Sequence, residues 1–281
     1  MPFLLSFYKP FTTAGYLVWW FWRHSRLFRH FCMVKDIEKY VPRGTIMSIV
    51  GENALLAYNL GTPGPEQKIT ALGVKDGQKV FVKFAGSATA KMNIINEGNI
   101  LKQLSQLDYV PEVIHMYSGN NFETLLTSVF EGERYSATPV NEKILALLFQ
   151  LRQIKIDAHV HHLGNFKNSF AHGDFCPWNL MKSNDYLRVF DWEMAGLYPE
   201  GYDLFTFIFQ TSFLLSPGRS IKSILTRNDK NICYFFSNID ILNWNPYLKE
   251  FANLKLQNAT NKGENLLAAR FSELVQYAEK A

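Results

Sequence analysis

The sequence has few cysteines and no repeated or low-complexity segment. Only three cysteines occur in 281 residues, they are far apart, and none forms a Cys-x-x-Cys pair. A sparse and odd number of cysteines is typical of a reducing compartment and argues against a disulfide-stabilised scaffold. We therefore expect a cytoplasmic protein that folds around a hydrophobic core.

The chain also lacks a strong net charge. The 29 basic and 25 acidic residues give a net charge of +4, which is too weak and too evenly spread to predict a nucleic-acid-binding surface. A hydrophobic content of 47% and an aromatic content of 15% indicate a globular chain with a substantial core. The length allows one large domain or two lobes around a cleft.

No segment is apolar for long enough to predict a membrane-spanning helix at the N-terminus. Lys9 and Arg23 enclose 13 uncharged residues, whereas a spanning helix needs about 20. The segment also lacks the leading basic region and cleavage site of a signal peptide. Two alternatives remain for residues 1–34. They form a helix packed on the core, or an interfacial anchor that gives peripheral contact with the inner face of the membrane, with tryptophans among lipid headgroups and arginines facing phosphates.

After this N-terminal segment the pattern becomes that of a small sheet with one helix. Short apolar runs separated by Gly/Pro-rich or Asp-Gly turns predict antiparallel strands, since Asp-Gly is a strong hairpin signal. A run with apolar residues at helical spacing follows, and then two further strands. The predicted strands cover residues 53–60, 68–74 and 79–85 and the stretch 109–131, and the predicted helix covers residues 91–107.

Beyond a predicted hinge at Glu131-Gly132 the pattern is mostly helical. Amphipathic helices are expected over residues 141–160, 202–215 and 265–280. We therefore predict an α+β, two-lobed fold with a small antiparallel sheet in one lobe and helices in the other. The predicted division is an aromatic and basic segment 1–43, an N-lobe 44–131 and a helical C-lobe 132–281. A cleft between lobes is a usual place for a ligand.

Several residues of the N-lobe match what transfer of a phosphoryl group from a nucleotide requires. Gly61 and Gly64 lie between two strands, where backbone amides can approach phosphate oxygens without hindrance from a Cβ. Lys83 lies on the third strand, and Glu97 follows it by 14 residues on the predicted helix. A cation on the phosphates, held by a carboxylate, is one of the requirements of this chemistry. A simple Gly-Pro turn and a pair of surface residues remain the alternatives.

The most specific signal is the run His172-Gly173-Asp174-x4-Asn179, with Asp191 12 residues further on. Asp174 can accept or orient the proton of a substrate hydroxyl. Asn179 and Asp191 supply oxygen atoms of the kind that Mg²⁺ prefers, from the two sides of a hairpin. A polar hairpin with Asp and Asn as turn formers is the alternative, but it does not explain all these residues in this order.

The segment "HGDFCPWNLMKSNDYLRVFDWE" (172–193) resembles the catalytic core of the aminoglycoside phosphotransferase and choline kinase-like family, a small-molecule branch of the protein-kinase fold. Both family patterns are present, His-Gly-Asp-x4-Asn and Ile/Val-Asp-Trp/Phe-Glu. The likeness extends less sharply to Lys83, to Glu97 and to the stretch "YDLFTF" (202–207), so that it covers about residues 44–215.

The resemblance implies an ATP- and Mg²⁺-dependent phosphotransferase with an alcohol group as acceptor. It assigns roles to individual residues, which are as follows. Asp174 is the catalytic base and His172 supports its loop; Asn179 and Asp191 bind Mg²⁺; Lys83 with Glu97 binds phosphate; Gly61 and Gly64 belong to the phosphate loop; Asp203 braces the catalytic loop; and residues 127–131, among them Ser128 and Phe130, line the adenine site.

The sequence departs from the protein-kinase pattern. His-Gly-Asp replaces His-Arg-Asp, Asp-Trp-Glu replaces Asp-Phe-Gly, and no activation segment ends in Ala-Pro-Glu, which argues against protein substrates. The glycine loop also departs from Gly-x-Gly-x-x-Gly. Residues 200–281, where the family builds its acceptor pocket, hold eight acidic and nine basic residues. This balance favours a neutral or anionic acceptor such as a sugar or glycolipid headgroup. An aminoglycoside or choline-like amine kinase, or a nucleotide-binding pseudokinase, remains the alternative.

Overall fold

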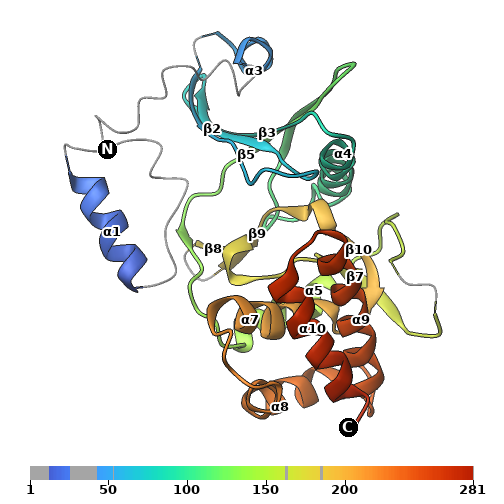
Figure 1. Ribbon diagram of the computed structural model, residues 1–281. Helices are drawn as coiled ribbons and strands as arrows, with labels where there is room; N and C mark the ends of the chain where they lie inside the picture. Colours follow the sequence, from blue (N-terminus) through green and yellow to red (C-terminus); the bar gives the residue numbers. More distant parts are fainter. Residues whose placement is uncertain (1–12, 26–42, 53, 162–163, 184–185, 281) are drawn as a thin grey trace. The chain divides into compact units, whose positions relative to one another are not determined.

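The computed structural model describes residues 13–25, 43–52, 54–161, 164–183 and 186–280 (Figure 1). Most of the predicted N-terminal segment and the tip of the predicted hairpin at residues 184–185 lie outside the described residues. Contacts divide the chain into two compact units, Met1–Arg134 and Tyr135–Ala281. Each unit is described by itself.

The first unit contains an antiparallel sheet of five strands in the order β1-β2-β3-β5-β4. Its strands are β1 (Leu55–Asn59), β2 (Ile69–Lys75), β3 (Gln78–Ala85), β4 (Val113–Ser118) and β5 (Glu123–Ser128). At the turn between β2 and β3, Asp76 and Gly77 have φ angles of 50° and 79°. Two positive φ angles are what a two-residue type I′ hairpin turn requires. The strands and the Asp-Gly hairpin predicted from the sequence are therefore present.

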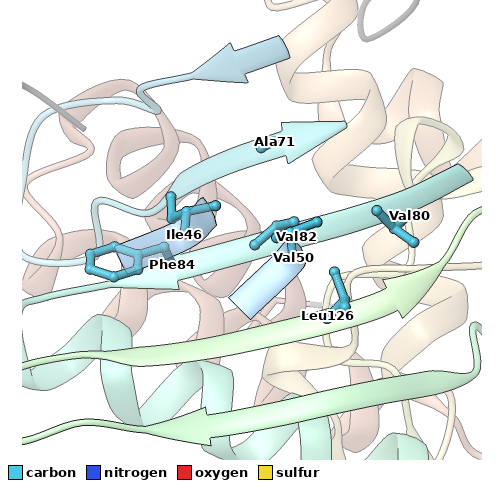
Figure 2. Packing of buried hydrophobic residues seen from close by; sticks show 7 residues of the cluster. All are labelled: Ile46, Val50, Ala71, Val80, Val82, Phe84 and Leu126. Carbon is cyan, nitrogen blue, oxygen red and sulfur yellow. The ribbon is translucent and has the colours of Figure 1, made fainter. Parts of the chain in front are cut away.

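One face of this sheet packs against α3 (Arg43–Val50). The alternate residues Val80, Val82 and Phe84 of β3 point to this face and are buried. Ile46 and Val50 of α3 complete the cluster, which also contains Ala71 and Leu126 (Figure 2). Since successive side chains of a strand point to opposite faces, this packing directs Lys83 to the other face.

The other face of the sheet packs against α4 (Ala88–Gln103). Ser87 begins this helix, because its side-chain oxygen accepts a hydrogen bond from the Ala90 amide at 3.3 Å. Gly98 lies so close to Met116 of β4 that a Cβ would overlap with the methionine side chain. This close approach buries the neighbouring Glu97, which is 2% exposed.

Helix α1 (Thr13–His24) is the described part of the aromatic N-terminal segment. Trp19 is buried, whereas Leu17, Val18, Trp20 and Phe21 are each more than half exposed. Among the described residues, no helix is both long enough and apolar enough to cross a membrane. The short strand β6 (Glu133–Arg134) ends the first unit.

The second unit is mostly helical, with two short strand pairs near the predicted catalytic residues. Strand β7 (Asn168–Ala171) pairs with β10 (Gly196–Pro199), and β8 (Leu180–Ser183) pairs with β9 (Tyr186–Val189), both antiparallel. The helices are α5 (Glu142–Leu151), α6 (Tyr202–Phe205), α7 (Thr211–Leu215), α8 (Ile221–Ser237), α9 (Asn245–Asn261) and α10 (Asn265–Ala278). Figure 1 shows α9 and α10 side by side.

The predicted helix 141–160 is too long, because α5 ends at Leu151. From Arg152 to Ala158 the side chains alternate between half-buried and exposed. That period of two is the period of an extended chain, not of a helix. The alternation of Ile154 and Ile156 with polar residues was present in the sequence and was misread as helical.

The predicted helix over residues 202–215 is present but irregular. A π-helical turn at Thr206–Gln210 joins α6 to α7. Phe205, Phe209 and Phe213 of this segment are all buried. Their rings pack against Phe251 of α9 and Phe271 of α10. This aromatic core holds the helix that carries Asp203 and Gln210.

Candidate active site

The first unit contains the predicted lysine–glutamate pair. Lys83 Nζ donates to both carboxylate oxygens of Glu97, at 2.8 and 2.6 Å. The two residues are only 7% and 2% exposed. The alternative that Glu97 is a surface residue is therefore excluded. A buried charged pair of this kind is costly to keep, and it leaves the ammonium group in a fixed position.

The loop that contains Gly61 and Gly64 is held by several polar contacts. The Gly61 amide donates to the Asn59 side chain at 2.9 Å, and Ser87 Oγ donates to the Pro65 carbonyl at 2.5 Å. Gly61 has a φ of +69°, and a Cβ there would overlap with the Lys68 carbonyl oxygen. Gly64 has a φ of +154° and open space around its Cα. The fold thus requires glycine at position 61 for the turn itself, and leaves room beside position 64.

The stretch 127–131 begins within β5, which ends at Ser128. Ser128 and Glu112 exchange two hydrogen bonds of 2.9 Å, because the Ser128 amide donates to the Glu112 carbonyl and Ser128 Oγ accepts from the Glu112 amide. Phe130 is half-buried. The exposed Glu131 forms an ion pair of 3.1 Å with Lys79. The Ser128 side chain is therefore hydrogen-bonded within the first unit.

The second unit contains the His-Gly-Asp loop, whose backbone is hydrogen-bonded to the side chain of Asp203. Its two carboxylate oxygens accept hydrogen bonds from the backbone amides of His172 and Gly173, at 2.7 and 3.0 Å. Burial raises the pKa of the Asp203 carboxyl above its usual value, although nearby positive charge and these two amides oppose the rise. The predicted bracing contact between Asp203 and the catalytic loop is thus present in the structure.

The hydrogen bonds of His172 identify its tautomer. Nδ1 lies 3.2 Å from the Asp174 amide, which must donate, so Nδ1 is the acceptor. Nε2 lies 3.0 Å from the Phe190 carbonyl and must donate. In this arrangement Nδ1 accepts and Nε2 donates. His172 is fully buried, and its contact with Phe190 connects the loop to the segment before Asp191.

Asp174 is half-buried, and each of its carboxylate oxygens has a side-chain amide as partner. Gln210 Nε2 donates to Oδ1 at 2.6 Å. Asn179 Nδ2 donates to Oδ2 at 2.9 Å and to the Asp174 carbonyl at 2.8 Å. Two donors on different oxygens fix the plane of the carboxylate, while partial exposure leaves it accessible to a reactant.

The residues around Asn179 fit the divalent cation that the family resemblance implies. Both contacts of the Asn179 amide nitrogen are made to Asp174, so the amide oxygen is the atom left to coordinate a cation. Asp191 has a φ of 70° in the left-handed region, which is uncommon outside glycine. An uncharged amide oxygen together with a carboxylate is a donor set that Mg²⁺ accepts.

The β8–β9 hairpin explains why Asn179 and Asp191 come together. Leu180 pairs with Val189 at the base of the hairpin, and the Phe190 amide donates to the Asn179 carbonyl at 3.1 Å. Asn179 and Asp191 therefore lie at the same end of the hairpin, as its antiparallel pairing requires. The structure thus brings the two predicted cation ligands together with Asp174.

Two residues of this network were missed from the sequence. Gln210 contacts Asp174, and Lys255 of α9 donates to Gln210 Oε1 at 2.9 Å and to the Gly173 carbonyl at 3.1 Å. Gln210 follows Asp203 by seven residues, a spacing that would have placed it near the same helix face. Lys255 carries no comparable signal, because it lies 81 residues after Asp174 and only the tertiary fold brings it to the loop.

Cys176 lies within the catalytic loop but is not a nucleophile. It is fully buried, and burial raises the pKa of its thiol well above the usual value. A thiol that stays protonated does not react as a thiolate. Cys176 is a packing residue.

Comparison with known proteins agrees with this geometry. Residues 130–219, which include the whole loop from His172 to Asp191, match the model of the phosphotransferase enzyme family. A search of curated protein sequences gave no significant match.

Solved structures share the fold at low sequence identity. An amicoumacin kinase in complex with AMP-PNP, Ca²⁺ and Ami has a TM-score of 0.54 and 10% identity, over 87% of this chain and 96% of that chain. The aminoglycoside phosphotransferase APH(4)-Ia, in a ternary complex with ADP and hygromycin B, has a TM-score of 0.51 and 12% identity, over 86% and 98%. APH(3'')-Id from Streptomyces rimosus, in complex with ADP and streptomycin, has a TM-score of 0.51 and 14% identity, over 83% and 98%.

These likenesses confirm the predicted α+β, protein-kinase-like fold. The family match falls on the segment that carries the His-Gly-Asp loop, Asn179 and Asp191. The resemblance noted in the sequence is thereby confirmed over residues 130–219, and the solved structures add the shared fold.

Proposed function

We propose that this chain is an ATP- and Mg²⁺-dependent kinase whose acceptor is a sugar or a glycolipid headgroup. The observation that carries the proposal is the arrangement around Asp174. Its carboxylate is held through both oxygens by Gln210 and Asn179 at 2.6 and 2.9 Å, yet it stays half-exposed. A turn-forming aspartate needs neither a fixed plane nor a partner 36 residues away in the chain.

The reaction follows from the positions of these side chains. Asp174 orients the acceptor hydroxyl and takes its proton as the oxygen forms a bond to the γ-phosphorus of ATP. The bond from this phosphorus to the oxygen that bridges to the β-phosphate breaks, and ADP leaves with that oxygen. Asn179 and Asp191 would hold Mg²⁺, which when bound offsets the negative charge of the phosphates. His172 and Asp203 keep the loop in place without contact with the reactants.

We assign nucleotide binding to residues 44–131 and acceptor binding to residues 132–281. The ammonium group of Lys83, fixed by Glu97, binds phosphate oxygens of ATP. The loop with Gly61 and Gly64 contributes backbone amides, and the stretch 127–131 contacts adenine. The support for these roles is the burial of the Lys83–Glu97 pair and the open space beside Gly64.

The charge of the second unit supports a neutral or anionic acceptor. Of the eight acidic residues between 200 and 281, Glu200 is paired with Arg152 and Asp203 with backbone amides. Both carboxylates are buried, so they stabilise the fold and do not add negative charge to an exposed acceptor surface. An aminoglycoside or a choline-like amine is the second candidate, since hygromycin B and streptomycin are present in the solved relatives.

The aromatic N-terminal segment supports a lipid-linked acceptor. Residues 1–34 contain four basic residues and no acidic residue. On α1, Leu17, Val18, Trp20 and Phe21 are exposed. We propose that this segment brings a cytoplasmic enzyme into peripheral contact with the inner face of the membrane. Co-sedimentation of the full chain with anionic vesicles, lost in a chain without residues 1–34, would support this; equal co-sedimentation of both chains would exclude it.

The test of the proposed reaction is ADP release with ATP and Mg²⁺ over three pools of acceptors. The pools contain hexoses and lipid-linked sugars, aminoglycosides, and choline-like amines. Asp174→Asn tests the base, and Asp240→Asn is the matched control because Asp240 is exposed and its positive φ of 58° suits Asn. We expect the sugar pool to stimulate the wild type and the control but not Asp174→Asn. Stimulation by an amine pool alone would replace the acceptor class, and Mg²⁺-dependent ATP binding without turnover in any pool would indicate a pseudokinase.

A further inference from the structure

A buried lysine lies behind the catalytic loop and has no role in the reaction described so far. Lys255 is 6% exposed and projects from α9. Its ammonium group donates to the Gly173 carbonyl at 3.1 Å and to Gln210 Oε1 at 2.9 Å, and it lies 5.2 Å from the centre of the Tyr202 ring. Burial of an ammonium group is costly unless it is hydrogen-bonded, so this position needs an explanation.

The contact with Lys255 determines how the Gln210 amide is oriented. An ammonium group can only donate hydrogen bonds, so the atom of Gln210 that faces it must be the carbonyl oxygen. The amide nitrogen then faces Asp174 Oδ1, to which it donates at 2.6 Å. The opposite orientation would place two donors against each other at Lys255 and two acceptors against each other at Asp174.

We propose that Lys255 and Gln210 form a relay that sets the orientation of the Asp174 carboxylate, and that both are positioning residues for phosphoryl transfer. The proposal rests on the proposed function of Asp174. Lys255 holds the amide, the amide holds Oδ1, and Asn179 holds Oδ2 from the other side. The same ammonium group also holds the Gly173 carbonyl, which is part of the loop itself.

The local helix geometry is consistent with this role. The π-helical turn covers Thr206–Gln210 and so ends at the residue that contacts Asp174. Such turns inside α-helices are frequent at functional sites. One helical segment thereby supplies both Asp203, which holds the backbone of the loop, and Gln210, which holds its carboxylate.

The relay predicts a specific kinetic pattern. Lys255→Met keeps the aliphatic stem but removes the donor, and Gln210→Met removes the amide. Because a small misplacement of a reacting group can reduce the rate by about 100-fold, we expect kcat to fall by about 10- to 100-fold in each variant while KM for ATP changes by less than about 3-fold. Because both residues act through the same amide, the double variant should be no slower than the slower single variant.

Two further variants separate positioning from a general structural effect. Lys249→Met changes a lysine of the same helix whose side chain is 44% exposed, and it should leave kcat unchanged. Lys255→Arg retains a donor and should recover part of the lost kcat. Additive losses in the double variant, or equal losses in Lys255→Met and Lys255→Arg, would overturn the relay.

A structural measurement tests the relay without any acceptor. In crystals of Lys255→Met we expect the distance from Gln210 Nε2 to Asp174 Oδ1 to exceed 3.5 Å, compared with 2.6 Å here. Persistence of the contact in this variant would refute the inference even if no acceptor is found. Conversely, an active wild type with unchanged kcat in both methionine variants would refute the relay and leave the proposed kinase activity intact.

Discussion

The buried ion pair between Arg152 and Glu200 offers a quantitative test of the second unit. Arg152 follows the last residue of α5, Leu151, and Glu200 follows β10. The guanidinium group donates to the carboxylate at 2.7 Å from Nη2 and at 3.1 Å from Nε, and Ser169 Oγ of β7 donates to the same carboxylate at 2.9 Å. The pair thus fixes the strands that lead into the catalytic loop. The change we consider is Arg152→Met, which keeps most of the aliphatic stem and removes the charge.

The magnitude follows from the burial of the two side chains. The Glu200 side chain is 1% exposed and that of Arg152 is 19% exposed. Without the guanidinium group, the carboxylate stays buried with the Ser169 hydroxyl as its remaining side-chain donor in the described structure. Loss of one partner of a buried pair costs about 3–5 kcal/mol in free energy of unfolding. With an m-value of about 2 kcal/mol/M, the urea midpoint should fall by about 2 M.

Urea unfolding followed by tryptophan fluorescence measures this loss. Lys249→Met is the matched control, since Lys249 pairs with Glu279 at 3.1 Å but the side chains are 44% and 51% exposed. An exposed pair contributes less than about 1 kcal/mol. The double variant Arg152→Met/Glu200→Gln should recover part of the loss, because it no longer contains the buried charge. Equal midpoints for Arg152→Met and Lys249→Met would refute this reasoning.

Three further predictions concern other parts of the chain. Lys83→Met should lower the free energy of unfolding of the first unit by about 3 kcal/mol, because Glu97 loses the cation to which it is bound in the interior; a loss below about 1 kcal/mol in urea would contradict this. Gly173→Ala should abolish acceptor-stimulated ADP release, since φ is +84° and a Cβ would overlap with the Met194 carbonyl oxygen; activity at the wild-type level would show that the loop does not keep this conformation. Burial lowers the pKa of His161 from 6.5 to about 4. Between these two pH values the unfolded chain binds a proton at this residue that the folded chain does not bind. As the pH falls from 6.5 to 4, the free energy of unfolding of the wild type should therefore fall by about 1–2 kcal/mol, a figure discounted for the partial exposure of the ring. His161→Phe should remove this contribution, and an unchanged pH dependence of the urea midpoint would contradict it.

Local patterns in the sequence predicted much of the first unit and the position of the His-Gly-Asp loop. Alternation along β3 placed Val82 and Lys83 on opposite faces, because a strand has a period of two. The Asp-Gly pair predicted the hairpin that aligns β2 with β3, because a type I′ turn needs positive φ angles. The run from His172 to Asn179 could be recognised as a candidate site from the sequence alone, because its residues lie within one short loop. The same reasoning failed at Ile154 and Ile156, where a short apolar alternation followed directly after a helix.

Only the tertiary structure decided what surrounds Asp174. Gln210 and Lys255 lie 36 and 81 residues after it, and the packing of aromatic side chains between the helix 202–215, α9 and α10 brings them to the loop. The burial of Glu97 likewise depends on the close approach of α4 to β4 at Gly98. A sequence pattern reports which face of its own element a side chain occupies, whereas hydrogen bonds between distant elements depend on how those elements pack. For that reason the sequence predicted Asp174 as the candidate base, whereas the packing of three helices determined which side chains hold it in place.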